Sequence, residues 1–112
     1  MPFISVRSAM PISESMMETL QKEIGRIITI IPGKTIDNCM TMLDGSIAAF
    51  MSGKPAKAVF CEIRVFGKAP KDKKASVVSE LNDLFAEKLG AEKVYIHIIE
   101  SDEWGSNGKY LG

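Results

Sequence analysis

The chain has 112 residues, of which 46% are hydrophobic and 25% charged, as in an ordinary globular domain and unlike a disordered segment. Fourteen basic residues balance fourteen acidic ones, so net charge offers no general attraction to nucleic acid or to an anionic membrane. We expect residues 1–112 to form a single domain. No basic leader with an apolar core opens the sequence and no apolar run would cross a bilayer, so a cytoplasmic location is expected.

The first elements in chain order are a strand and a helix. Residues 3–8 predict a strand that ends before Met10 and Pro11. Behind it, apolar residues recur at spacings of three and four, the pattern of a helix that buries one side. These residues are Met17, Leu20, Ile24, Ile27, Ile28 and Ile31.

Capping residues predict where this helix begins and ends. Ser15 followed by Glu18 fits a capping box, and Ser13 is a competing N-cap. Pro32 and Gly33 end the helix, since proline cannot continue it and glycine accepts the backbone conformation that follows.

Three further strands and a second helix follow. Residues 38–43 predict the second strand, residues 58–66 the third and residues 94–99 the fourth. The second helix begins after Pro70 and ends at Gly90. Its apolar side carries Val78, Leu81, Phe85 and Leu89.

The order strand, helix, strand therefore occurs twice, which predicts an α+β fold. Two βαβ units would merge into one four-stranded mixed sheet with both helices on one face. The third strand would turn Val59, Cys61, Ile63 and Val65 to the helices. The opposite face would then expose Phe60, Phe66, Tyr95 and Ile99. Such a patch is large for a monomer, so we expect copies of the same chain to cover it.

Cysteine and histidine are too few for a metal cluster. Cys39 and Cys61 both lie in apolar stretches, where we expect them to be buried and unreactive. With one histidine in the chain, no metal site is expected.

Five short motifs occur in an order that resembles the tautomerase superfamily. They are MPFI at the start, PGK after the first helix, VFGK and VYIHI in the last two strands, and WGSNG near the end. More closely, the chain resembles the branch of macrophage migration inhibitory factor and D-dopachrome tautomerase. The resemblance implies a homotrimer that interconverts keto and enol forms of small acids such as phenylpyruvate, without a cofactor.

The resemblance also implies roles for individual residues. In that family the start methionine is removed and the exposed proline nitrogen, here that of Pro2, is the catalytic base. Lys34 would hold the substrate carboxylate, and Phe66 would enclose the substrate together with Tyr95 of a neighbouring subunit. His97 stands where the best-known members have asparagine, so the charge of this site would vary near neutral pH. By residue type alone, Lys34 would be a solvated lysine and Tyr95 an interface residue.

Two alternatives to a tautomerase remain open. One is a protein-binding, cytokine-type role with the pocket incidental, which only family analogy supports. The other is a different reaction of the superfamily, such as hydration-dehalogenation or decarboxylation. Those reactions use additional arginines in the pocket, and the chain offers only Arg7, Arg26 and Arg64.

Overall fold

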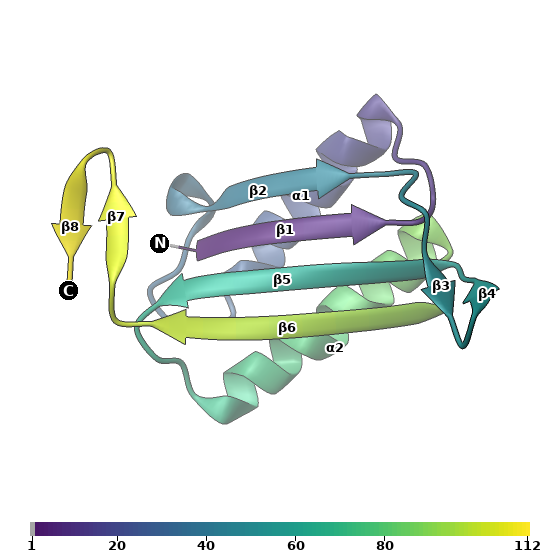
Figure 1. Ribbon diagram of the computed structural model, residues 1–112. Coiled ribbons are helices and arrows are strands. Elements are labelled where there is room, and N and C mark those ends of the chain that lie inside the picture. Colours follow the sequence, from purple (N-terminus) through teal and green to yellow (C-terminus); the bar gives the residue numbers. More distant parts are fainter. Residues whose placement is uncertain (1) are drawn as a thin grey trace.

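The computed structural model describes residues 2–112, which form a layer of strands covered by two helices (Figure 1). The long strands are β1 (Pro2–Ser8), β2 (Met40–Asp44), β5 (Ala58–Phe66) and β6 (Lys93–Ser101). The helices are α1 (Glu14–Ile28), α2 (Lys71–Leu89) and the short 3-10 helix η1 (Ile36–Asn38). Two small hairpins pair β3 (Phe50–Met51) with β4 (Lys54–Pro55) and β7 (Trp104–Ser106) with β8 (Lys109–Leu111).

The four long strands form one mixed sheet in the order β2-β1-β5-β6. The outer pairs β1·β2 and β5·β6 are parallel, and β1 runs antiparallel to β5 where the two units meet. Both α-helices cover the same face, and the two hairpins lie at opposite ends of the sheet (Figure 1). The predicted fold class, two βαβ units with both helices on one face, is therefore confirmed.

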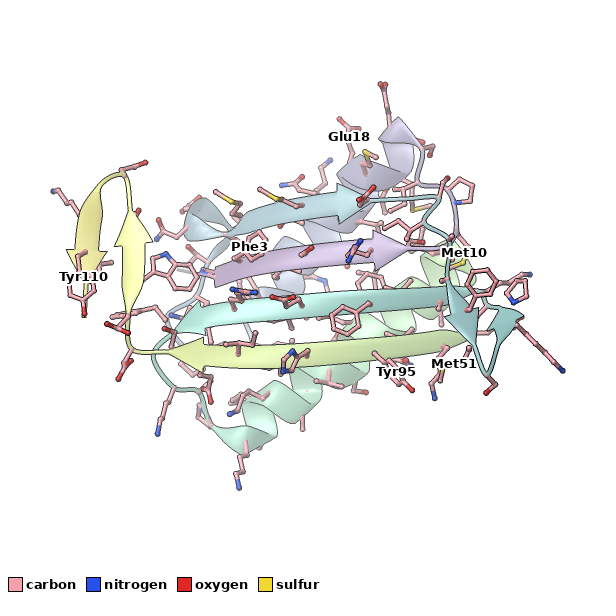
Figure 2. All side chains as sticks on the ribbon, in the orientation of Figure 1. Phe3, Met10, Glu18, Met51, Tyr95 and Tyr110 are labelled. Carbon is pink, nitrogen blue, oxygen red and sulfur yellow. The ribbon has the colours of Figure 1, made fainter. Side chains whose placement is uncertain are left out.

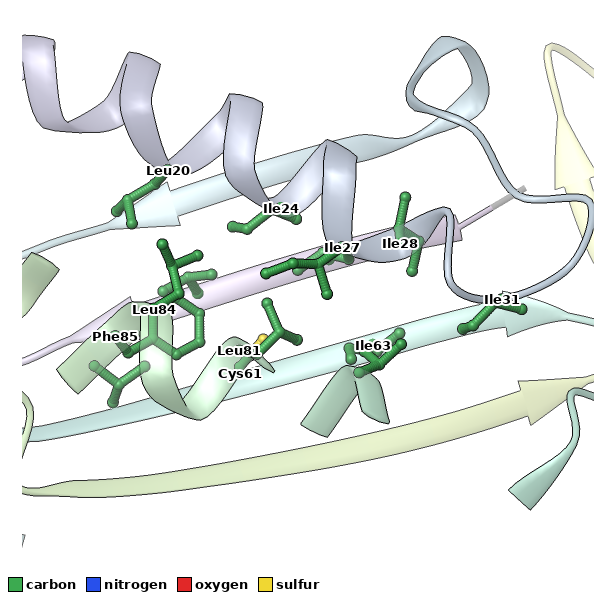
Figure 3. Close-up of a cluster of buried hydrophobic side chains, with 14 of the residues drawn as sticks. Leu20, Ile24, Ile27, Ile28, Ile31, Cys61, Ile63, Leu81, Leu84 and Phe85 are labelled. Atoms are coloured by element: carbon green, nitrogen blue, oxygen red, sulfur yellow. The ribbon is translucent and has the colours of Figure 1, made fainter. Parts of the chain in front are cut away.

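The core lies between the helices and the sheet (Figure 3). Leu20 and the isoleucines of α1 meet Leu81 and Phe85 of α2 above the buried side of β5. Leu20, Ile24, Phe85, Cys61 and Ile63 all have no exposed surface. Burying one such side chain contributes about 1.5–3 kcal/mol, so this layer holds the helices on the sheet.

The N-cap of α1 is Ser13, the competing candidate, and not Ser15 of the predicted capping box. The Ser13 hydroxyl accepts the backbone N–H of Met16 at 3.2 Å, and the helix begins at the next residue, Glu14. The helix ends at Ile28, before the predicted stop, and Ile31 stays buried in the turn that follows. At the other helix, Gly90 is the C-cap in the left-handed conformation, with φ 70°, as predicted.

Two sequence predictions within the core need correction. The buried side of α2 passes through Val77, whereas Val78 is exposed, because the packed positions follow Val77 at steps of four to Leu81 and Phe85. Cys39 is the C-cap residue of η1 and only half-buried, because the 3-10 turn delays the start of β2 to Met40. Cys61 is buried as predicted, and burial raises the pKa of its thiol to about 12.

The face of the sheet away from the helices, here called the open face, carries large apolar side chains. Phe60 and Tyr95 are exposed at 41% and 51%, as predicted. Phe66 and Ile99 are only partly exposed, contrary to prediction. Exposed methionines at positions 40 and 42 of β2 extend the open face, a contribution that the sequence analysis missed. Neither helix of the described chain combines the length and apolarity needed to span a membrane.

Candidate active site

A cleft of about 620 Å³ lies where β1 begins, between the sheet and the β7–β8 hairpin. Figure 1 shows the hairpin standing beside the N-terminal end of β1. The sheet supplies one part of the lining, namely Pro2, Phe3, Met40, Arg64, Ile99 and Ser101. The hairpin and the turn before it supply another part, which includes Glu103, Trp104 and Asn107. We call this space the Pro2 cleft.

Strand register builds the floor of the Pro2 cleft. Phe3 pairs with Met40 on one side and with Arg64 on the other, and Arg64 pairs in turn with Ile99. Paired residues on neighbouring strands point to the same face, so these four side chains form one row across the open face. Pro2 precedes this row, pairs with Val65 and is less than 2% exposed.

The cleft contains one cation and one carboxylate among its described lining residues, Arg64 and Glu103. The Arg64 Nε donates a hydrogen bond to the carboxylate of Glu62, two residues before it on the same strand. The Glu103 carboxylate accepts a hydrogen bond from the Tyr110 hydroxyl at 3.0 Å. Its backbone is tied to Ser101, whose hydroxyl donates to the Glu103 carbonyl at 2.7 Å. These contacts hold the hairpin wall against the end of β6.

Lys34 and Phe66 are in direct contact with each other. The Lys34 ammonium donates a hydrogen bond to the Phe66 carbonyl at 3.0 Å. Both residues line a smaller cavity of about 110 Å³ that does not include Pro2. Val65 is close to both spaces, because it pairs with Pro2 of the cleft and itself lines the smaller cavity.

The segment after β5 is held by contacts with the end of β6. The Gly67 N–H donates to the Ser101 carbonyl at 2.7 Å. Glu100 accepts the Ala69 N–H at 2.6 Å and the Lys74 ammonium at 2.8 Å. The hydrogen bond from Lys74, followed by that from Ala69, lowers the pKa of the Glu100 carboxyl. This clamp fixes the course of the chain next to Phe66.

The predicted site residues therefore fall into three places. Pro2 lines the cleft, and Lys34 lies with Phe66 beside it. Tyr95 lies toward the opposite end of the sheet from Phe3 (Figure 2), next to a separate groove of about 300 Å³. His97 pairs with Glu62 in the middle of the open face. One chain does not bring Tyr95 or His97 to the Pro2 cleft, and their predicted roles stay predictions. The predicted removal of Met1 concerns a residue outside the described range.

Arg64, Glu103 and Trp104 line the cleft but were not among the predicted site residues. Alternation along the third strand already placed Arg64 on the open face, but its neighbours Phe3 and Ile99 depend on pairing between distant strands. Among residues 2–112, no group of three or more histidine, cysteine or acidic residues could hold a metal ion.

Comparison with known proteins gives no match to a protein-family model or to a curated protein sequence. Solved structures do match along the whole chain. The crystal structure of Leishmania major MIF2 has a TM-score of 0.90 at 19% identity, covering 99% of this chain and 97% of that one. The macrophage migration inhibitory factor-like protein from Entamoeba histolytica has a TM-score of 0.86 at 22% identity, with 98% of each chain covered.

The structure of a fused trimer is similar as well. The structure of a fused 4-OT symmetric trimer has a TM-score of 0.82 at 16% identity, covering 96% of this chain and 94% of that one. Together these likenesses show that the chain has the fold that these macrophage migration inhibitory factor-like proteins and the fused 4-OT trimer share. The fold that the sequence motifs implied is thus confirmed.

Proposed function

We propose that this protein is a cofactor-independent tautomerase that interconverts the keto and enol forms of a small 2-keto acid, with Pro2 as its general base. The observation that carries the proposal is the position of Pro2. It is buried at the start of β1, and it borders a cleft whose sheet side is apolar except for the Arg64 guanidinium and the Ser101 hydroxyl. A proline nitrogen placed there has the surroundings that proton transfer to and from carbon requires.

The chemistry depends on removal of Met1, which turns the Pro2 nitrogen from an amide into a secondary amine. An ordinary α-amine has a pKa of about 7.7–8.0 and is mostly protonated at neutral pH. Apolar surroundings and a nearby cation both disfavour the ammonium, so the pKa of this amine is expected to lie lower. The free amine takes a proton from the carbon beside the keto group, and the ammonium so formed returns a proton to the keto oxygen, which gives the enol and regenerates the amine.

Other parts of the site support a substrate of the phenylpyruvate type. Phe3, Ile99 and Trp104 supply apolar surface for an aromatic ring. Lys34 and Phe66 are proposed to border the same substrate, since Val65, which pairs with Pro2, immediately precedes Phe66. A contact between Lys34 and the substrate requires its ammonium to leave the Phe66 carbonyl, to which it donates at 3.0 Å.

We further propose that the protein is a homotrimer in which a neighbouring subunit completes the site. The exposed Phe60, Tyr95 and Met42 leave the open face with more apolar surface than a monomer usually keeps. The fused 4-OT structure that shares this fold is a symmetric trimer. A neighbour packed on the open face brings its own Tyr95 and His97 to the Pro2 cleft.

The proposal is tested by changing only what precedes the Pro2 nitrogen. One preparation begins at Pro2 and a second retains one extra residue before it, with both first residues checked by intact mass. Enol–keto interconversion of phenylpyruvate is then followed by ultraviolet absorbance. We expect the preparation beginning at Pro2 to be active and the extended one to lose at least about a hundredfold, the size of a general-base contribution. Equal activity would overturn the proposal.

Two variants serve as controls. Pro2→Gly keeps a terminal amine and should retain part of the rate. His97→Asn removes the single imidazole of the chain, which is another candidate proton acceptor. The rate should rise with pH through a pKa below that of an ordinary α-amine in both the parent and His97→Asn. A pH dependence that disappears with His97 would assign the titration to that residue instead.

A further inference from the structure

We propose that Arg64 binds the carboxylate of the substrate and thereby selects 2-keto acids over uncharged analogues. The inference rests on the proposed function for the identity of the substrate. It concerns a residue to which the sequence motifs assign no role.

Arg64 lies in the middle of the cleft floor. It faces Phe3 across the β1·β5 pair and Ile99 across the β5·β6 pair. Opposed Cα atoms of antiparallel strands are about 4.5–5.5 Å apart, so Arg64 starts within one residue of the Pro2 position. Its side chain is 53% exposed and lines the cleft. Both Arg64 and Pro2 line the cleft, so a ligand that fills it can contact both residues.

The Arg64 guanidinium is held through one of its three nitrogen atoms. Its Nε is held by the Glu62 carboxylate, which is not part of the cleft lining. Within residues 2–112 its two terminal amino groups make no hydrogen bond or ion pair. A guanidinium presents parallel N–H groups that match the two oxygens of a carboxylate. Glu62 thus orients the Arg64 guanidinium, and its two terminal amino groups remain able to donate to a ligand.

The remaining charges of this region direct an anion to Arg64. Glu103 lies in the hairpin part of the lining, where its negative charge repels a carboxylate. Lys34 donates to the Phe66 carbonyl and borders the smaller cavity rather than the Pro2 cleft. An acid in the cleft therefore places its carboxylate over the sheet and its apolar group against Ile99 and Trp104.

Trp104 provides a direct binding readout, because it is the single tryptophan of the chain and lines the cleft. Tryptophan fluorescence is titrated with phenylpyruvate and, separately, with its uncharged methyl ester. The proteins compared are the parent, Arg64→Gln, Arg64→Lys and Lys34→Gln. Arg26→Gln removes the same charge from α1, where Arg26 pairs with Glu23, and is the matched control.

We expect Arg64→Gln to weaken phenylpyruvate binding about ten- to a hundredfold, the loss of a hydrogen bond to a charged group. Binding of the methyl ester should stay within about twofold, and Arg64→Lys should restore part of the affinity for the acid. Arg26→Gln should bind both compounds like the parent. Circular dichroism of each variant checks that a weakened affinity does not come from unfolding.

The outcomes separate this inference from the proposed function. If the acid binds through Arg64 but no interconversion occurs in protein beginning at Pro2, the tautomerase proposal fails and the Arg64 assignment stands. If the enzyme is active and Lys34→Gln, but not Arg64→Gln, weakens acid binding, the Arg64 assignment is overturned. Equal losses for acid and ester in Arg64→Gln, or no binding of phenylpyruvate by the parent, would also overturn it.

Discussion

The two faces of the sheet differ in what their side chains contact, although the same strands build both. On β5, Cys61 and Ile63 have no exposed surface and pack under the helices, while Phe60 and Arg64, which flank them, are exposed. The covered face buries apolar area within one chain, so substitutions on this face should lower the stability of the fold. The open face is available to substrates and to other copies of the chain. Substitutions on the open face should therefore alter ligand binding and assembly.

The largest expected effect is loss of packing on the covered face. Phe85→Ala should lower the free energy of unfolding by about 3–5 kcal/mol, because it removes a fully buried ring and leaves a cavity. Urea denaturation followed by circular dichroism measures this. Val78→Ala on the same helix is the matched control and should cost less than about 1 kcal/mol, since Val78 is exposed. Similar losses in both variants would contradict the observed helix orientation.

A charge on the open face should prevent assembly without unfolding the chain. Phe60→Glu places a carboxylate beside Tyr95 on the apolar open face, where burial against a second subunit would be costly. Sedimentation velocity at micromolar concentration should show a trimer for the parent and a monomer for the variant, with the same circular dichroism. Phe60→Leu keeps an apolar side chain and should remain trimeric. A monomeric parent would refute the proposed covering of this face.

The covered side of β6 ends in a carboxylate, which should make stability depend on pH. The pKa of Glu100 is lowered in the folded chain, so its contribution is present above the unfolded value of about 4.3. It is lost as the pH falls through the lower, folded value. Glu100→Gln should destabilise the protein at pH 7 by less than about 1 kcal/mol, since the Lys74 pair is partly exposed. This difference should vanish near pH 2.

Thermal unfolding at several pH values measures the effect of Glu100. Glu87→Gln is a suitable control, because Glu87 is exposed on α2 and makes no ion pair within the described residues. A constant difference between parent and Glu100→Gln from pH 7 to pH 2 would show that the Lys74 contact does not act through charge.

The smallest expected effect concerns the two thiols. Burial raises the pKa of Cys61 to about 12 and also raises the pKa of the half-buried Cys39. Only the thiolate reacts with an alkylating reagent, so Cys61 should stay unmodified at pH 8 in the folded protein. Cys39 should react slowly, and both should react in denaturant. Mass spectrometry of peptides after iodoacetamide treatment distinguishes the two, and faster labelling of Cys61 would contradict its burial.

Local patterns in the sequence were enough to predict both faces and both helices. Alternation assigned Ile63 to the covered side and Arg64 to the open side of the third strand, as observed. Helix periodicity placed Val78 on the buried side of the second helix, one position away from the residue that is buried there. Helix periodicity tolerates such an error, because neighbouring positions of a broad apolar side satisfy the pattern almost equally well.

The sequence by itself determined the order of the four long strands and two α-helices, the buried side of the third strand, and the proline at the start of the first strand. Only the tertiary structure decided that Phe3, Met40 and Arg64 share one row and that Lys34 contacts the Phe66 carbonyl. Alternation is a property of a single strand and can be read locally. Register between strands far apart in the chain depends on how the whole sheet packs under its helices, so the lining of the cleft was not readable from local patterns.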